Sequence, residues 1–349
     1  MTTDALSDLL KTVRLTGAAF FDVVACAPWC AEQPTREQVL PKVLPGAEHL
    51  VSYHAITEGE CYAYLIDGEP MRLRAGEIVV FTRGDAHVLS SAPGLRAQPV
   101  TQADFDAVTS GPLPFFRDVG SPGAPTVRMV CGFLACDARP FNPLLDALPP
   151  VIKATPPPEG QSSWLRDFIP LAVAETAAKR AGSEGVLAKL SELMFIEVVR
   201  RYIAALPEQQ SGWLAGLRDP QVGKALSLLH GDPAKPWTIE ELAHAVALSR
   251  SVLAERFTAL VGMPPMHYLA RWRMQVASGM LSAGHANIAT IAAETGYGSE
   301  AAFSRAFKKV VGLPPSAWRT RAGRPVVLPP AANDGREGER DAALLGYID

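Results

Sequence analysis

Two histidines and a cysteine in the N-terminal half have side chains suited to holding a metal ion. His54, His87 and Cys131 lie in three separate short segments with the pattern of strands. Imidazole nitrogen and thiolate sulfur are the usual ligands of zinc, so the three residues could form a partial zinc site inside one barrel. Ordinary hydrogen bonds or core packing are the alternative, which the sequence favours. Zinc is the only cofactor that the sequence suggests.

The cysteines offer a second kind of chemistry. There are five, an odd and small number for 349 residues, which argues against a disulfide framework. Cys26, Cys30, Cys61 and Cys131 are candidates for sensing oxidants. That role requires an exposed thiol with a lowered pKa.

The segments that carry these residues read as strands. From His49 to Ser91 short runs such as HLVSYHAI and CYAYLI alternate with turn signals, and Asp67-Gly68 predicts a hairpin. Val127–Leu134 reads as a later strand of the same domain. Strands at this spacing favour a sandwich or barrel. The five prolines between Leu148 and Gly160 predict the end of that domain.

Two amphipathic helices are expected next, at Ser163–Lys179 and Val186–Ala205. They could brace the two ends of the chain or form a dimer seam, or they could pack on their own barrel. No apolar run of about 18 residues exists, so no membrane partner is expected. The first residues lack the features of a secretion signal, and we expect a cytoplasmic protein.

Charge is distributed unevenly along the chain. The net charge is −3, but Trp213–Arg324 holds 13 basic and 7 acidic residues, a net of +6. The remainder holds 33 − 13 = 20 basic and 36 − 7 = 29 acidic residues, a net of −9. A basic block in an acidic chain indicates an anionic partner.

The basic block contains a repeat. IEELAHAVALSRSVLAERFTALVGMPPMHYL begins at Ile239, and IATIAAETGYGSEAAFSRAFKKVVGLPPSAW begins at Ile288. The offset grows from 49 to 50 within the repeat, which places one inserted residue in the turn between two helices. Repetition at a fixed offset reports a duplicated structural unit.

Each copy predicts a short helix, a turn and a longer helix. Ser249 and Ser299 suit the N-cap of the longer helix, and Gly262 and Gly312 suit the left-handed position that ends it. This order is a helix-turn-helix, whose second helix enters the major groove of double-stranded DNA. The candidate DNA contacts are Arg250, Ser251, Ala254 and Glu255 in the first copy, and Ser299, Glu300, Ala301, Ser304, Arg305 and Lys308 in the second.

The segment between the copies, Pro264–Gly284, predicts one rigid helix that joins them. Such a helix would fix the separation of the two reading helices. The expected footprint is two adjacent major-groove segments about 10 bp apart.

The block from about Leu217 to Arg321 resembles the DNA-binding domain of AraC/XylS-type bacterial transcription regulators. The resemblance is carried by DPQVGKALSLLHGDPAKPWTIEELA, LSRSVLAERF and GYGSEAAFSRAFKKVVGLPPSAWR. It implies a transcription regulator, usually an activator, that works with RNA polymerase. A small-molecule effector and a homodimer are implied partners.

The N-terminal half is similar to the cupin-type sensor domain of one branch of these regulators, through YHAITEGECYAYL and LRAGEIVVFTRGDAHVLSS. Cupin enzymes hold a metal with HxH, Glu and a further His. This chain retains only His54 and His87, with Glu58 or Glu60 downstream, which argues against catalysis. The other reading is a metal-dependent cupin enzyme with an appended DNA-binding module.

The predicted fold is therefore multidomain, with an all-β cupin barrel and an all-α domain of two helix-turn-helix motifs. The predicted parts are a sensor domain (1–157), a helical connector (158–212), the DNA-binding domain (213–324) and a flexible tail (325–349).

Overall fold

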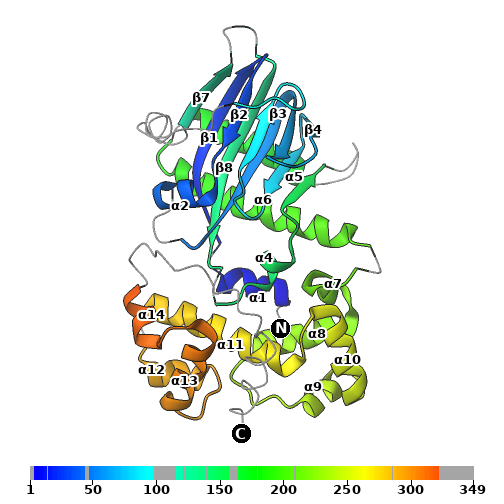
Figure 1. The fold of residues 1–349 in the computed structure, drawn as a ribbon, viewed down its shortest axis with the longest axis vertical. Helices are drawn as coiled ribbons and strands as arrows, with labels where there is room; N and C mark the ends of the chain where they lie inside the picture. The colour runs from blue at the N-terminus through cyan, green and yellow to red at the C-terminus, as the bar shows by residue number, and fades with distance from the viewer. Residues whose placement is uncertain are drawn as a thin grey trace. The chain divides into compact units, whose positions relative to one another are not determined.

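The structure is a computed structural model that describes residues 4–13, 15–43, 47–97, 115–120, 123, 125–138, 140–156, 164–178, 180–207, 210–284 and 286–321. The predicted tail, 325–349, lies outside these residues. Two compact units are present. The barrel unit comprises the described residues of 15–136 and 148–205, and the helical unit those of 1–14, 137–147 and 206–349. Both units are drawn in Figure 1.

The barrel unit consists of strands followed by two long helices. The strands are β1 (Thr16–Cys26), β2 (Cys30–Gln33), β3 (His49–Leu65), β4 (Met71–Arg74), β5 (Ile78–Phe81), β6 (His87–Ser90), β7 (Phe115–Gly120), β8 (Val127–Cys136) and β9 (Val151–Ala154). The helices are α2 (Arg36–Val43), α5 (Trp164–Ala178) and α6 (Ser183–Ala205).

Strand β3 belongs to two sheets. Its first half pairs with β8 and β5, in a sheet of order β7-β1-β8-β3-β5-β9, and its second half pairs with β6 and β4, with β2 beyond β6. The strand changes sheet at Gly59, whose φ is +74°. A Cβ atom there would lie 2.0 Å from the carbonyl oxygen of Thr126, so only glycine fits. The predicted barrel is confirmed.

Two details differ from the sequence prediction. The runs HLVSYHAI and CYAYLI form one strand, because the chain bends at Gly59 without leaving the ladder. The proline-rich stretch after Leu148 contains β9, which pairs with β5. The four residues of β9, Val-Ile-Lys-Ala, lie between the prolines, so each has a backbone N–H group that can take part in the ladder. The Asp67-Gly68 hairpin is confirmed, with the Gly68 amide donating to the carbonyl of Leu65 at 2.9 Å.

Helix α6 packs on β1, β8 and β9. The approach is close at Gly17 of β1, where a Cβ atom would lie 2.6 Å from the carbonyl oxygen of Ala188. Tyr53 of β3 reaches the same helix through a 2.7 Å hydrogen bond between its hydroxyl and that of Ser191. Since side chains alternate along a strand, the next residue, His54, points to the opposite face of the sheet, into the barrel.

The helical unit contains the repeat together with segments distant in sequence. Its helices are α1 (Ala5–Thr12), α4 (Pro143–Ala147), α7 (Trp213–Arg218), α8 (Pro220–Gly231), α9 (Ile239–Ala245), α10 (Arg250–Val261), α11 (Pro265–Ala283), α12 (Ile288–Glu294), α13 (Glu300–Val311) and α14 (Pro315–Arg321). Helix α1 packs on α8 and α11, where the His230 imidazole bonds the carbonyl of Ala5 at 3.1 Å.

Both copies of the repeat form the predicted helix-turn-helix. Four residues separate α9 from α10 and five separate α12 from α13, so the inserted residue lies in the turn. The Ser249 and Ser299 hydroxyls accept from backbone amides at the start of α10 and α13. Gly262 and Gly312 end these helices with φ of 85° and 84°.

Helix α11 packs against both copies, as the sequence predicts. Tyr268, near its start, lies edge-on to Phe257 of α10. Met274, Ala277 and Leu281, toward its end, share one hydrophobic cluster with α12 and α13. With 19 residues at about 1.5 Å each, the helix is about 28 Å long.

Candidate nucleic-acid interface and barrel cavity

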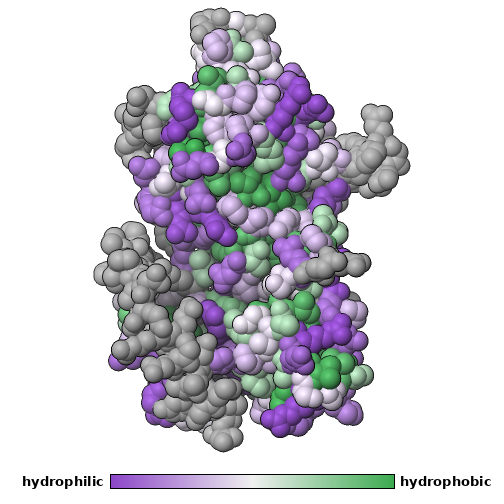
Figure 2. Space-filling model, turned by 45° about the vertical axis from the view of Figure 1, so that its right-hand side comes forward, coloured by the Kyte–Doolittle hydropathy of each residue, from purple (hydrophilic) through white to green (hydrophobic). Residues whose placement is uncertain are grey.

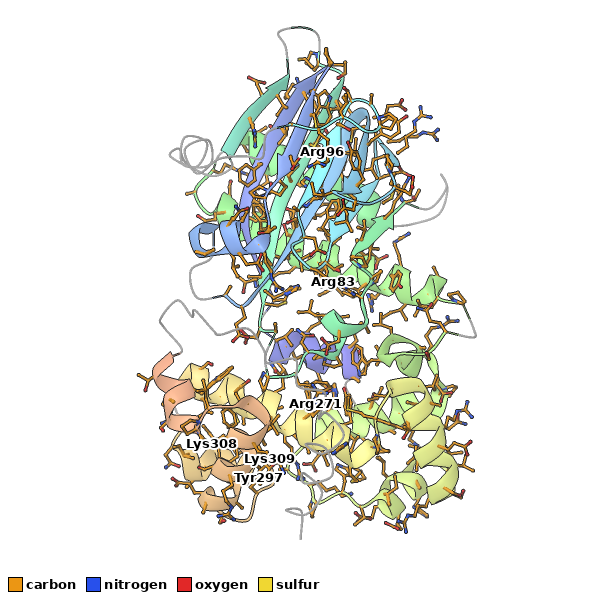
Figure 3. The ribbon with its side chains drawn as sticks, viewed as in Figure 1. Arg83, Arg96, Arg271, Tyr297, Lys308 and Lys309 are labelled. Atoms are coloured by element: carbon orange, nitrogen blue, oxygen red, sulfur yellow. The ribbon has the colours of Figure 1, made fainter. Side chains whose placement is uncertain are left out.

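Helix α13 has one apolar face and one exposed polar face. Phe303, Ala306 and Phe307 are buried in the core of the second copy. The predicted contact residues lie outside that core. Five of them are exposed and Ser304 is half-buried; the exposed ones are Ser299, Glu300, Ala301, Arg305 and Lys308. Figure 3 shows Lys308 and Lys309 on α13 and Tyr297 in the turn before it.

Helix α10 presents a different set of side chains. Arg250, Ser251 and Glu255 are exposed and Ala254 is half-buried, so the predicted face is open to a partner. The Arg250 guanidinium already pairs with the Glu240 carboxylate of α9 at 2.9 Å. The only other charge among the predicted residues of α10 is the Glu255 carboxylate, which repels phosphate. Since α13 carries Arg305, Lys308 and Lys309, it is the better phosphate-binding helix of the two.

Arg273 of α11 holds the two copies together. Its side chain is 2% exposed and donates hydrogen bonds to the carbonyls of Pro233 and Lys235, at 2.7 and 2.9 Å, in the loop before α9. The same guanidinium lies 5.9 Å from the ring centroid of Tyr297, in the turn between α12 and α13. Burial lowers the pKa of Arg273. These contacts restrict movement of one reading helix relative to the other.

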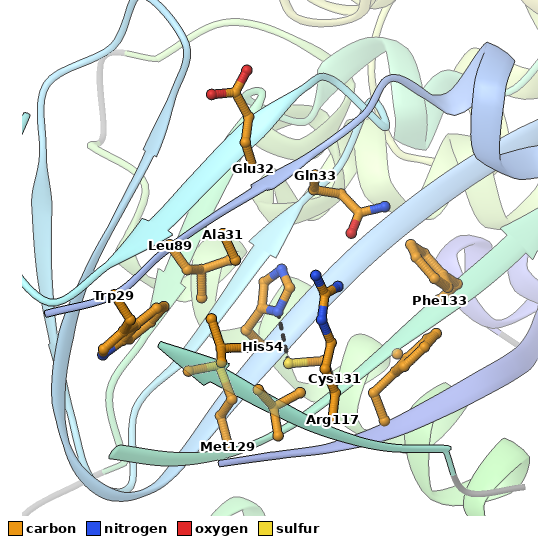
Figure 4. A pocket seen from close by; sticks show the side chains of 14 residues that line it. Trp29, Ala31, Glu32, Gln33, His54, Leu89, Arg117, Met129, Cys131 and Phe133 are labelled. Atoms are coloured by element: carbon orange, nitrogen blue, oxygen red, sulfur yellow. Dashed lines mark hydrogen bonds between the residues drawn. The ribbon is translucent and has the colours of Figure 1, made fainter. Parts of the chain in front are cut away.

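The barrel encloses a cavity. About 760 Å³ of empty space lies among its lining side chains, counting the open mouth. Its lining comes from six strands and the loop after β1: Phe21, Val23, Trp29, Ala31, Glu32, Gln33, His54, Leu89, Arg117, Val119, Met129, Cys131, Gly132 and Phe133. Most of these side chains are apolar (Figure 4).

His54 and Cys131 line this cavity, and together with His87 they form a linear chain of hydrogen bonds. His87 Nδ1 lies 2.9 Å from the carbonyl oxygen of Asp85, which can only accept, so His87 donates there and its Nε2 accepts. His54 Nε2 therefore donates to His87 Nε2 at 2.9 Å. His54 Nδ1 is left to accept the Cys131 thiol proton at 2.9 Å. All three groups are neutral in this arrangement.

The pKa values agree with the neutral chain. Burial, and then the nearby His87, lower the pKa of His54 well below its ordinary value. Burial lowers the pKa of His87 to about 4, against a smaller opposing effect of the Asp85 carbonyl. Burial raises the pKa of the Cys131 thiol well above its ordinary value.

The predicted zinc set is brought together but does not converge on one point. The two nitrogens of His54 point to opposite sides of the ring, one to Cys131 and one to His87, so a single ion cannot bind all three residues in this arrangement. In the described part of the chain no group of three His, Cys, Asp or Glu residues is placed to hold a metal ion. The geometry thus corresponds to the hydrogen-bonding alternative.

The candidate redox cysteines do not share one environment. Cys61 and Cys131 are buried, and burial raises the pKa of Cys61 to about 12. Burial and the Glu32 carboxylate raise the pKa of Cys30, which is half-buried. Cys26 is also half-buried, with its Sγ 3.3 Å from the carbonyl of Gly123. The structure thus shows no lowered thiol pKa at Cys30, Cys61 or Cys131.

Arg117 is the functional candidate that the sequence analysis missed. It lies in β7, in register with Val23 of the parallel strand β1, and its side chain lines the cavity. The local sequence FFRDVG does not indicate whether its arginine lines a cavity or faces solvent. The alternation of Arg117 with Asp118 and Val119 was the available hint, because it places Arg117 and Val119 on one face.

Two family models match the chain. A Cupin model matches residues 4–204, more than half of the chain, and a helix-turn-helix domain model matches residues 242–321. Among the described residues no helix is long and apolar enough to span a membrane.

Relatives of similar length are known. A putative AraC-like transcription regulator of Streptomyces lividans is 33% identical over 92% of this chain and 100% of its own. One from Streptomyces antibioticus is 34% identical over 90% of this chain and 98% of its own. The HTH-type transcriptional regulator AlkR of Acinetobacter baylyi is 28% identical over 91% and 100%.

Proposed function

The chain belongs to the AraC-like transcription regulators, and we propose that it reads DNA mainly through α13 and that a small molecule in the barrel cavity controls this binding. DNA binding and transcription regulation follow from the family. The contact residues, the controlling signal and the form of control are the proposal. On this proposal the barrel senses a ligand and catalyses no reaction.

The observation that carries the proposal is the contrast between the two reading helices within one fixed frame. Helix α13 presents Arg305 and Lys308 beside the small side chains of Ala301 and Ser304, which permits close approach to base edges. Helix α10 presents Glu255, whose carboxylate would repel the phosphates of DNA. Arg273 contacts loops next to both copies and so limits their relative movement. In this arrangement α13 supplies most of the positive charge toward DNA, and α10 helps to position α13 on the DNA.

Control by an organic ligand is supported better than control by metal or oxidant. The cavity has mostly apolar walls. Both nitrogens of His54 are already hydrogen-bonded, and the thiol pKa values of Cys61 and Cys131 are raised. Activation through RNA polymerase is the mode that the family resemblance implies.

Formation of a homodimer is supported by the exposed faces of α5 and α6. Four large apolar side chains are exposed there, Leu171, Val173, Val186 and Leu193, with exposed fractions from 39% to 55%. The surface in Figure 2 shows hydrophobic patches within a largely hydrophilic cover. A homodimer that buries these side chains would remove apolar surface from water.

Selection from a random DNA library with the purified full chain tests the proposed reading mode. We expect enrichment of two short blocks about 10 bp apart, and the block read by α13 should be the more strongly constrained. Binding should weaken steeply with salt, because neutralising phosphates releases counterions. Enrichment of a single block, or of none, would contradict reading by a fixed pair of helices.

A further inference from the structure

The charged groups of the cavity differ in whether they are already neutralised. Among the described lining residues, Glu32 and Arg117 are the charged ones. Glu32 is 6% exposed, and its carboxylate accepts two hydrogen bonds from the Arg96 guanidinium, at 2.9 and 3.0 Å. This bidentate pair satisfies the carboxylate, so Glu32 is not available to a cationic ligand.

Among the described residues Arg117 has no such partner. Within the described residues its guanidinium makes no ion pair and no hydrogen bond with another side chain or with the backbone. It is half-buried, and pairing of β7 with β1 holds its side chain on the cavity face next to that of Val119. In Figure 4 the guanidinium points into the cavity beside His54 and toward the Gln33 amide. A cation in an apolar wall that no described carboxylate neutralises favours an anion from outside.

The other polar groups of the wall limit what that anion can contact. His54 and Cys131 are bonded to each other, and His54 is also bonded to His87. The backbone of Gln33 belongs to the β2–β6 ladder, but its side-chain amide makes no hydrogen bond with another described residue and remains available. Among the described lining residues, Arg117 and Gln33 thus supply the polar side chains that remain open to a ligand. The rest of the wall is apolar and aromatic, with Phe21, Trp29 and Met129 among its side chains.

We propose that the barrel cavity binds a small organic monocarboxylate, with the carboxylate on the Arg117 guanidinium and the Gln33 amide and with an apolar body against the aromatic wall. The planar guanidinium matches a carboxylate with two parallel hydrogen bonds, which a neutral amide or an alcohol cannot form. An amine is repelled by the same charge. The inference rests on the proposed function, because it names the class of the controlling ligand.

The test compares molecules that differ only at the polar end. Hexanoate, hexanamide and hexylamine form one set, and phenylacetate, phenylacetamide and phenethylamine form another. Their dissociation constants are measured by calorimetry with the full-length protein and with Arg117→Gln and Arg117→Lys. Arg72→Gln is the matched control, since Arg72 is an exposed arginine of β4 paired with Glu60, away from the cavity. Circular dichroism and the melting temperature confirm that each variant is folded.

We expect at least one carboxylate to bind at least tenfold more tightly than its amide, and its amine to bind least. Arg117→Gln should abolish this preference, and Arg117→Lys and Arg72→Gln should retain it. The proposal is overturned if acid and amide bind equally, if Arg117→Gln keeps the preference, or if neither carboxylate binds at millimolar concentration.

Failure of this inference and failure of the proposed control give different results. A carboxylate that binds through Arg117 but leaves DNA affinity unchanged would contradict control by the cavity and leave its ligand class intact. If another molecule fills the cavity and changes DNA affinity while both carboxylates fail to bind, the control stands and the carboxylate class is wrong.

Discussion

The guanidinium of Arg273 lies directly against Gly296, so close that a Cβ atom at Gly296 would lie 2.7 Å from Arg273 Nη2. The same Cβ atom would lie 2.6 Å from the carbonyl oxygen of Ala234. Gly296 belongs to the turn of the second helix-turn-helix, and Ala234 belongs to the loop that precedes the first. The two copies of the repeat therefore meet through this turn as well as through α11.

Substitution of Gly296 by alanine should loosen this contact. The residue has φ +80°, where a side chain is strained, and the new methyl group would collide with backbone and with a buried guanidinium. We expect a loss of about 1–3 kcal/mol in the free energy of unfolding. Affinity for a site with two blocks should fall more than affinity for one block alone.

Gly298→Ala is the matched control for this prediction. It lies two residues away, and a Cβ atom there would have nothing within 4 Å. Denaturant unfolding of both variants compares the two positions directly. Equal stability of Gly296→Ala and Gly298→Ala would show that the contact does not hold the copies together.

Stability should decrease as the pH falls from about 7 toward 5. Burial lowers the pKa of His87 to about 4 and that of His230 to about 3, and it lowers the pKa of His54 as well. In the unfolded chain each histidine titrates near pH 6.5. Below that value the unfolded chain binds protons that the folded protein does not, which costs roughly 1 kcal/mol per pH unit for each histidine.

Thermal unfolding between pH 8 and pH 5 measures this effect before most carboxylates titrate. His87→Gln should show a shallower decrease, because one of the buried imidazoles with a lowered pKa is gone. His244→Gln is the control, since His244 is exposed on α9 and its replacement should leave the slope unchanged. A melting temperature that stays constant over this range would contradict the neutral hydrogen-bond chain.

Thiol labelling should separate the cysteines by environment. The thiolate is the reactive form, so buried thiols with a raised pKa react slowly. We expect iodoacetamide to modify the half-buried Cys26 and Cys30 in the folded protein, while Cys61 and Cys131 react only after unfolding. Mass spectrometry of peptides gives the order. Early modification of Cys131 would contradict this prediction and support oxidant sensing by the Cys131 thiol.

The helix-turn-helix repeat could be read from the sequence because its signals are local. Ser249, Ser299, Gly262 and Gly312 each act within one turn of their own helix, and the offset of the repeat placed the inserted residue correctly in a turn. The family resemblance covers the same segments, and a helix-turn-helix domain model matches residues 242–321. What the pattern did not reveal was Arg273 joining the copies, since a buried arginine looks like any other charged residue of a helix.

The barrel was less predictable, because its site depends on contacts between distant strands. His54, His87 and Cys131 were correctly placed near one another, but the direction of each hydrogen bond depends on the carbonyl of Asp85. The sequence also did not indicate which segments make up each unit. Helix α1 and residues 137–147 pack with the C-terminal helices through contacts such as the Phe141 amide with Gln275 Oε1, at 2.9 Å, and no local pattern reports such a contact.

The most direct test of DNA reading by α13 is the affinity of Arg305→Ala for a selected site and for random DNA, measured by fluorescence anisotropy at constant salt. Lys308→Ala provides the comparison, because Lys308 is expected to bind phosphate. The account predicts that Arg305→Ala loses about 1–3 kcal/mol on the selected site and much less on random DNA. Lys308→Ala should weaken both equally. Equal losses for Arg305→Ala on both DNAs, or no loss on either, would contradict base reading by this helix.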